Sequence, residues 1–389
     1  MISTRYNQNI LFYLLLATAS IFVLSLFLLQ LFAGILVFFW IFEKNSEKKK
    51  AMDLLSFAVL AFGIVRIAAI IFSNYHSASN EAFYKEALFY FSFFSFNFYL
   101  KIFNDEKKHF LIIVFLGACI FASLTGIISF NFSLVERAQS FSSGGTVFSA
   151  YLLASLPVLI FFPFEKTNKI GRFFWIAGIA IILTGIFTSL GRTNIAISVL
   201  IVGFSVLYRK INIINLITII ALVSLFSIIS FHNNSGLVSR RIENPLFPSE
   251  RDVIIKGAKV LMYDQPIIGF GPRTFRNIFP LFNEFSDKGV AGWHNDFLQI
   301  YFESGIIGLF SFLLLLSVIY YIGIKIFKKD KNNKDLILGF LLSISCFVLL
   351  VTSGFITSPV LSIVFVLIIT LQNSYGRQRI IPENKIYYN

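Results

Sequence analysis

Long apolar stretches alternate with short polar stretches from one end of the 389-residue chain to the other. As a helix, an apolar stretch of about 20 residues crosses the hydrocarbon core of a bilayer. The apolar stretches cover residues 10–24, 26–42, 53–72, 84–103, 109–129, 146–164, 173–190, 193–208, 212–231, 297–326, 335–352 and 355–372. This pattern predicts an all-α, polytopic integral membrane protein with about twelve transmembrane helices that form a single membrane domain over residues 1–389.

The connector at residues 232–296 is much longer than the others and has a pattern of its own. Ser249 is suited to cap a helix, and Pro266 marks the region where that helix ends. Apolar and small residues between them share one helical face: Val253, Ile254, Gly257, Val260 and Leu261. The segment therefore predicts an amphipathic helix that lies along the membrane surface, within one large loop.

The chain carries a net charge of +13, which raises the question of a nucleic-acid partner. The Lys and Arg residues argue against one, because they lie in short clusters between the apolar stretches. These clusters fill every second connector, at residues 43–50, 101–109, 164–172, 208–210 and 325–334, and follow the last stretch. Cytoplasmic connectors show this excess. Both termini are therefore expected in the cytoplasm, and the long loop outside.

Three arginines lie near turns or helix starts on the predicted outer side. Arg192 opens the helix that follows the turn TSLGRTNIAIS, Arg251 lies in the first turn of the amphipathic helix, and Arg273 follows the glycine-rich turn GFGP. Helix starts present unpaired N–H groups, and a guanidinium grips phosphate with two hydrogen bonds. The alternatives are an Arg192 that reaches lipid head groups and a surface helix with incidental charges.

The stretch GWHNDFLQIYFESGIIGLFSFLLLL, residues 292–316, begins with polar residues and ends with a run of apolar residues typical of a membrane span. We expect Trp293 to anchor the interface, and His294 to stand at the start of the tenth span. Spacing places three polar residues on one helical face: Asp296, Gln299 and Glu303. Gly305 and Gly308 are expected to permit close helix packing. His294 is either a structural hydrogen-bonding residue or a general base.

A base, two or three anion-binding arginines and a membrane surface together suit a lipid-phosphate substrate. The sequence contains no Asp-x-Asp pair and no cluster of His, Asp and Glu with the spacing of metal ligands. The two cysteines lie apart within apolar stretches, so they indicate neither a disulfide nor a metal site. We therefore expect no metal and no other cofactor.

His294-Asn295 followed by Gly305 and Gly308, with Arg251 and GFG ahead of them, resembles the signature of the O-antigen ligase family. The turn that carries Arg192 is similar to the family's outward turn. The resemblance implies a GT-C-like glycosyltransferase of the bacterial inner membrane, whose donor is a glycan on undecaprenyl diphosphate. The acceptor is lipid A-core for ligases, or another lipid-linked glycan for O-antigen polymerases.

The resemblance also implies roles for individual residues. His294 is the expected catalytic base on the periplasmic face, and Arg192 and Arg251 are expected to hold the diphosphate, with Arg273 replacing or assisting Arg251. Asn295, Glu303, Gly305 and Gly308 are supporting residues. Around Arg137 the chain carries Ser142-Ser143-Gly144-Gly145 where an Asn-Pro-Asn run is common in the family, so Arg137 receives no role.

Arg66 is the one arginine within a predicted span, and it is either an extra phosphate contact or the partner of a buried acid such as Glu303. Ligase and polymerase activities both stay open, with transfer of glycan to a protein hydroxyl as a third activity. A transporter of lipid-linked sugars is a more distant alternative, because it would need charged residues along a path through the membrane.

Overall fold

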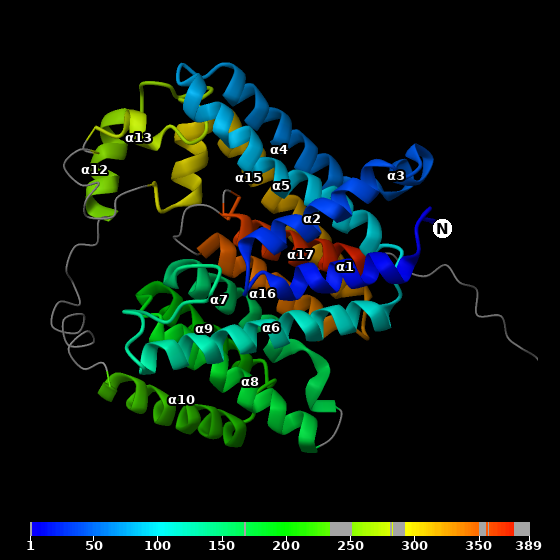
Figure 1. The fold of residues 1–389 in the computed structure, drawn as a ribbon, viewed down its shortest axis with the longest axis vertical. Helices are drawn as coiled ribbons and strands as arrows, with labels where there is room; N and C mark the ends of the chain where they lie inside the picture. Colours follow the sequence, from blue (N-terminus) through cyan, green and yellow to red (C-terminus); the bar gives the residue numbers. More distant parts are fainter. Residues whose placement is uncertain are drawn as a thin grey trace, which may run out of the picture.

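The computed structural model describes residues 2–166, 169–233, 251–280, 282, 292–349, 355–356 and 358–376, and in these ranges the secondary structure is helical. The helices are α1 (Gln8–Ile21), α2 (Leu26–Ile41), α3 (Asn45–Ala51), α4 (Leu54–Ile71), α5 (His76–Leu100), α6 (Asp105–Asn131), α7 (Gly145–Phe161), η1 (Pro163–Lys166), α8 (Lys169–Thr188), α9 (Arg192–Leu207), α10 (Ile213–Asn233), α12 (Arg251–Leu261), α13 (Phe275–Ile278), α15 (Asp296–Lys329), α16 (Lys334–Leu349) and α17 (Pro359–Ser374). Most of them run back and forth across the molecule as one bundle (Figure 1).

Each of the twelve apolar stretches coincides with one of these helices, which makes the chain an all-helical, polytopic membrane protein. By length and hydropathy, five described helices can cross a membrane on their own, or six if the bent pair α2 and α3 counts as one span. Four others, α1, α7, α9 and α17, are apolar but shorter than 18 residues. The helices thus confirm where the apolar stretches lie, while the number of spans stays a prediction.

Short polar side chains fix where several helices begin. Asp53 accepts a hydrogen bond from the backbone N–H of Ser56 at 2.9 Å, and so caps α4. Asn295 does the same for α15, with 3.0 Å to the N–H of Leu298. Such caps satisfy N–H groups that have no partner inside the helix.

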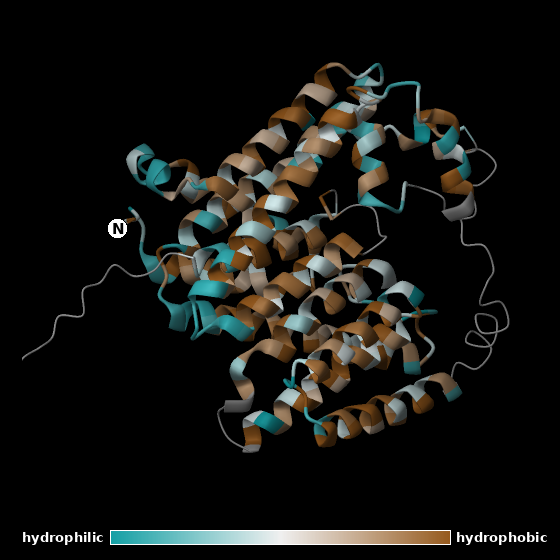
Figure 2. Cartoon of the chain, turned by 180° about the vertical axis from the view of Figure 1, so that it is seen from behind, coloured by the Kyte–Doolittle hydropathy of each residue, from teal (hydrophilic) through white to brown (hydrophobic). Residues whose placement is uncertain are grey.

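Two helices, α7 and α17, are apolar on every side and lie at the centre of the bundle. Within α17 every residue after Pro359 is buried, and α17 contacts α2, α5, α7, α15 and α16. α7 is buried throughout from Phe148 to Phe161. The outer helices instead expose large apolar side chains, and in Figure 2 hydrophobic residues cover the middle of the bundle while hydrophilic residues gather on the side of the N-terminus. An all-round apolar helix is typical of a membrane protein's interior.

The connectors with clustered Lys and Arg meet at one end of the bundle. The backbone N–H of Ser3 donates to Glu47 at 2.8 Å, and Lys101 pairs with Asp53. Asp53 also accepts a hydrogen bond from Asn373, at 2.7 Å. The first connectors, the N-terminus and the end of α17 therefore lie on one side, as the alternation of charges predicts.

Hydrogen bonds also join the connectors that are poor in Lys and Arg. The hydroxyl of Ser142 donates to the carbonyl of Phe22, and the N–H of Ala138 donates to the carbonyl of Thr188 at 3.1 Å. The hydroxyl of Ser73, after α4, donates to the carbonyl of Phe270 in the long loop at 2.7 Å. The long loop therefore lies on the side of these connectors.

The described part of the long loop has a small hydrophobic core of its own. It contains Ile254, Ala258, Leu261, Phe275, Ile278, Phe279, Trp293 and Phe302. One prediction is wrong here, and a second holds only in part. Trp293 is buried and stacks on Phe302 with ring centroids 4.1 Å apart, so it does not anchor the interface. The predicted apolar face of α12 packs on this core through Ile254, Gly257 and Leu261, while Val260 points outward and is 67% exposed.

Candidate functional site

The helix that follows His294 is broken near its start. Within α15, Gly305 has φ +65° and ψ −166°, which is not helical, so residues 296–304 form a short first segment and residues 306–329 a long second one. Residues with side chains hardly ever adopt this conformation. Gly305 does permit a close approach as expected, but at a break in the helix and against a loop backbone rather than against another helix.

A stretch of the long loop, residues 265–271, fills this break. The N–H groups of Phe270 and Gly271 donate to the carbonyls of Phe302 and Glu303, at 2.8 and 3.0 Å. In the opposite direction, the N–H of Ile306 donates to the carbonyl of Pro266 at 2.8 Å. The inserted loop thus supplies hydrogen bonds that an unbroken helix would make internally. It ties the loop to α15 on both sides of the break.

Glycine is required on both sides of this contact because the two backbones touch. A Cβ atom on Gly305 would lie 2.0 Å from the carbonyl oxygen of Ile267, and one on Gly269 would lie 2.5 Å from the backbone nitrogen of Ser304. A Cβ atom on Gly271, which has φ +102°, would collide with the side chain of Ser73. The GFG motif and Gly305 are therefore complementary halves of one contact.

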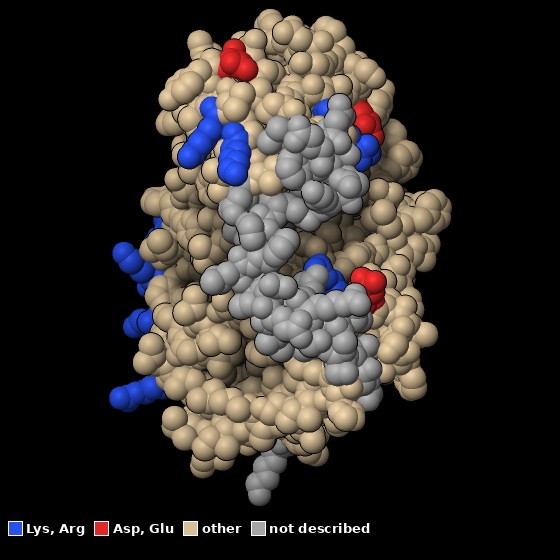
Figure 3. All heavy atoms as spheres, turned by 90° about the vertical axis from the view of Figure 1, so that its left-hand side faces the viewer, with Lys and Arg blue, Asp and Glu red and all other residues tan. Residues whose placement is uncertain are grey.

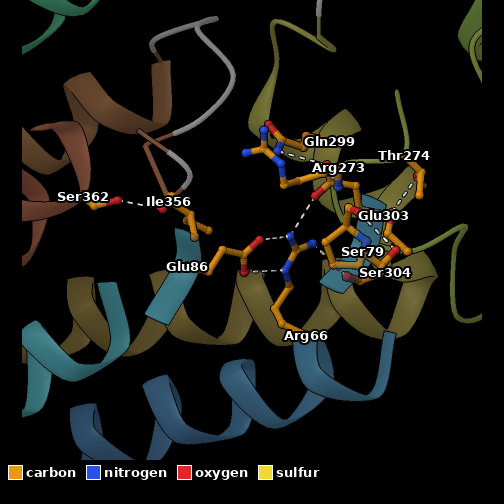
Figure 4. Close-up of polar contacts among 12 residues, drawn as sticks. Arg66, Ser79, Glu86, Arg273, Thr274, Gln299, Glu303, Ser304, Ile356 and Ser362 are labelled. Atoms are coloured by element: carbon orange, nitrogen blue, oxygen red, sulfur yellow. Dashed lines mark hydrogen bonds and ion pairs between the residues drawn. The ribbon is translucent and has the colours of Figure 1, made fainter. Parts of the chain in front are cut away.

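Beside the break lies a buried cluster that contains Arg66, Glu86, Glu303 and Ser304, which we call the Arg66 cluster. Figure 4 shows Arg66 rising from α4 toward Glu86 of α5 and toward the end of the first segment of α15. Arg66 makes two hydrogen bonds with Glu86, one of them from Nε at 3.1 Å. It also donates to Glu303 at 2.8 Å and to the Ser304 hydroxyl at 2.9 Å.

The Arg66 cluster answers the question that the sequence leaves open about Arg66. Its side chain is 3% exposed, and so is that of Glu86, while that of Glu303 is 2% exposed. A buried charge is tolerated only with close partners of opposite charge, which both carboxylates provide. Arg66 is thus the partner of two buried acids, and a phosphate would have to displace one of them to reach it.

Glu303 connects this cluster to the long loop. Its Oε2 accepts from Arg66, and its Oε1 accepts from the backbone N–H of Arg273 at 2.9 Å and from the Gln299 side chain at 3.2 Å (Figure 4). The predicted face of Gln299 and Glu303 is confirmed. One carboxylate therefore joins α4, the loop and the first segment of α15.

The side chain of Arg273 points away from the buried cluster. Its backbone adopts φ +60°, and its guanidinium is 29% exposed, with Nε 3.5 Å from a carboxylate oxygen of Glu81. Lys85 and Arg273 lower the pKa of the Glu81 carboxyl, with Lys85 as the larger cause. Arg273 is thus a cation at the surface, opposite one exposed carboxylate.

His294 lies two residues before α15, in a tightly packed segment. Its φ of +49° is unusual for a residue with a side chain, and its ring is half-buried. The neighbouring Trp293 packs edge-on against Phe275, with ring centroids 4.9 Å apart. Because Phe275 is two residues after Arg273, the segments that carry His294 and Arg273 lie side by side.

Arg192 belongs to a different group of helices. It is the first residue of α9, as predicted, and it is exposed after a turn in which Leu190 has φ +57°. α9 packs against α7 and α8, and Asn194 donates to Ser149 of α7 at 2.6 Å. The side chain of Arg251 lies outside the described residues, as does Ser249; the backbone of Arg251 begins α12, as predicted.

The structure thus joins Arg273, Glu303 and Arg66 by hydrogen bonds and places the segment of His294 and Asn295 beside that of Arg273, whereas Arg192 lies on α9, which packs against α7 and α8. Figure 3 shows this end of the bundle, with Lys and Arg side chains on its upper part and others nearer the middle. In the described ranges, no three His, Cys, Asp or Glu side chains lie close enough to hold a metal ion.

Sequence reasoning missed Glu86, Ser304 and the role of Gly269. A signal for Glu86 exists, since it is an acid that leads directly into the apolar run ALFYFSFF of α5. No sequence signal identifies the loop that enters the helix break, because the contact joins the two backbones.

Comparison with known proteins adds one finding. Residues 173–313 match the family model described as O-antigen ligase (Wzy_C), and this range contains Arg192, Arg273 and His294. Among curated proteins, none matches the chain. Residues 173–313 therefore resemble an O-antigen ligase domain, within a chain that is an all-helical, multi-pass membrane protein.

Proposed function

We propose that this protein is an O-antigen ligase-like glycosyltransferase that moves a glycan from undecaprenyl diphosphate to lipid A-core on the periplasmic face of the bacterial inner membrane. The observation that carries the proposal is the match of residues 173–313 to the O-antigen ligase family. The arrangement of His294 and Arg273 around the broken start of α15 supports it.

The proposed orientation rests on the two ends of the bundle. The end that joins the N-terminus, residues 43–53 and the end of α17 carries the clusters of Lys and Arg, which favours the cytoplasm. The opposite end carries the long loop, the start of α9 and the start of α15. We therefore assign twelve spans in a GT-C-like arrangement, cytoplasmic termini and a periplasmic active site.

The proposed reaction is a displacement at the anomeric carbon of the lipid-linked sugar. A hydroxyl of the acceptor forms the new glycosidic bond, the bond between that carbon and the phosphate oxygen breaks, and undecaprenyl diphosphate leaves. His294 accepts the proton of the hydroxyl as general base. Arg192, Arg251 and Arg273 hold the diphosphate and neutralise its growing charge. The sugar–diphosphate bond provides the driving force.

Deletion of the gene followed by gel analysis of lipopolysaccharide tests this function. A ligase predicts loss of every O-chain, with accumulation of lipid-linked polymer. A single repeat on the core would instead indicate a polymerase that joins lipid-linked repeats. Unchanged lipopolysaccharide and unchanged lipid-linked polymer would contradict the proposal.

A further inference from the structure

We propose that Glu303 is the positioning residue that sets the His294 segment and the Arg273 loop in register with each other. This inference rests on the proposed function, because it assigns His294 and Arg273 to the reacting groups. It extends that function by identifying the side chain that fixes two short backbone segments relative to each other.

Neither piece is part of a long helix, although backbone hydrogen bonds and aromatic contacts also hold them. The segment with His294 precedes a helix of nine residues, 296–304, that the break at Gly305 separates from the rest of α15. Arg273 lies in a loop between α12 and α13, in a left-handed backbone conformation. A short helix and a loop each need tertiary contacts to keep one position.

Glu303 provides those contacts from the last turn of the short helix. Oε1 receives the N–H of Arg273 at 2.9 Å, which fixes the backbone of the loop. Oε2 receives Arg66 at 2.8 Å, and Arg66 is part of the long, packed helix α4. The carboxylate therefore ties both pieces to the rigid part of the bundle, and hydrogen bonds with a charged partner are the strong ones.

Glu86 offers a matched control. It is also a buried carboxylate paired with Arg66, through two hydrogen bonds, but the hydrogen bonds described for its side chain reach only Arg66. Glu86→Gln and Glu303→Gln thus remove the same charge from the same arginine. The two variants differ because Glu303 must accept from both Arg66 and the N–H of Arg273, and the glutamine of Glu303→Gln has one acceptor oxygen for these two donors.

The experiment compares these variants in transfer kinetics and in hydrogen–deuterium exchange of residues 270–274. For Glu303→Gln we expect kcat to fall about 100-fold, the effect of a misplacement of roughly 1 Å, with faster exchange in this loop. For Glu86→Gln we expect kcat and loop exchange close to wild type. Equal losses of kcat in both variants, or unchanged exchange in Glu303→Gln, would overturn the proposal.

A milder variant covers the case in which Glu303→Gln does not fold. Gln299→Ala removes the longer hydrogen bond to Oε1, 3.2 Å, from a partly exposed position. It is expected to lower kcat less and to speed exchange at 270–274, and no change in either would overturn the proposal. If wild-type protein transfers no glycan, the proposed function fails, whereas the exchange comparison still decides the role of Glu303.

Discussion

Arg66 and Arg192 are two arginines near the same end of the bundle, yet their surroundings differ completely. Arg66 is buried and makes four hydrogen bonds, to Glu86, Glu303 and Ser304. Arg192 is exposed at the first position of α9, behind a turn with a left-handed residue. The first lies in the group α4, α5 and α15, and the second in the group α7, α8 and α9.

The difference agrees with a structural role for Arg66 and with the diphosphate-binding role proposed for Arg192. The partners of Arg66 come from two other helices, α5 and α15, so its charge holds the outer ends of these helices and α4 together. A guanidinium at an exposed helix start is placed to meet an anion from outside, because the unpaired N–H groups beside it attract the same charge. Substitution should therefore change stability in the first region and activity in the second.

The largest expected effect is on stability, at Arg66. Arg66→Met leaves Glu86 and Glu303 buried without a cation, and loss of one partner of a buried pair costs about 3–5 kcal/mol. We expect a much lower melting temperature in detergent, or no folded protein. A variant that melts like wild type would mean that the cluster contributes little to stability.

At Arg192 the expected effect is on transfer. Arg192→Ala should lower kcat by roughly 10²–10³-fold, the usual effect of removing one group that stabilises charge in the transition state, with an unchanged melting temperature. Arg192→Lys should be nearly as damaging, because an ammonium group lacks the planar fork of guanidinium. Kinetics of purified protein measure both, and full activity of the Lys variant would show that charge alone suffices.

A smaller effect is expected from glycines in the two regions. Gly305→Ala forces a side chain into the helix break and should cost on the order of 1–3 kcal/mol in backbone strain alone. The control is Gly203→Ala within α9, where a Cβ would meet nothing within 4 Å. There the melting temperature should stay the same or rise slightly, since Ala favours helix by about 1 kcal/mol. Equal melting temperatures for the two variants would contradict the role of the break.

Much of the fold follows from the sequence, because hydrophobic runs determine where membrane helices lie. The twelve apolar stretches, the starts of α9 and α12 and the grouping of the basic connectors all agree with the structure. The prediction failed at Trp293 and at the outer face of α12. There the long loop forms its own apolar core, and periodicity alone does not say whether an apolar face meets lipid or protein.

The candidate site was predictable in its residues but not in its arrangement. His294, Arg273 and Glu303 stand out as polar residues near apolar runs. Their mutual contacts depend on the insertion of residues 265–271 into α15, and on Glu86 from a helix more than 200 residues away in sequence. A hydrogen bond between two backbones needs no particular side chain. Only the glycines that allow the close approach mark it in the sequence.

The proposed function depends most on His294 as the general base of glycan transfer beside the broken start of α15. Its most direct test measures transfer by purified His294→Ala from a glycan on undecaprenyl diphosphate to lipid A-core. We expect the rate of transfer to fall about 10²–10⁴-fold, the usual contribution of a general base, with a wild-type melting temperature. Transfer at the wild-type rate would contradict it.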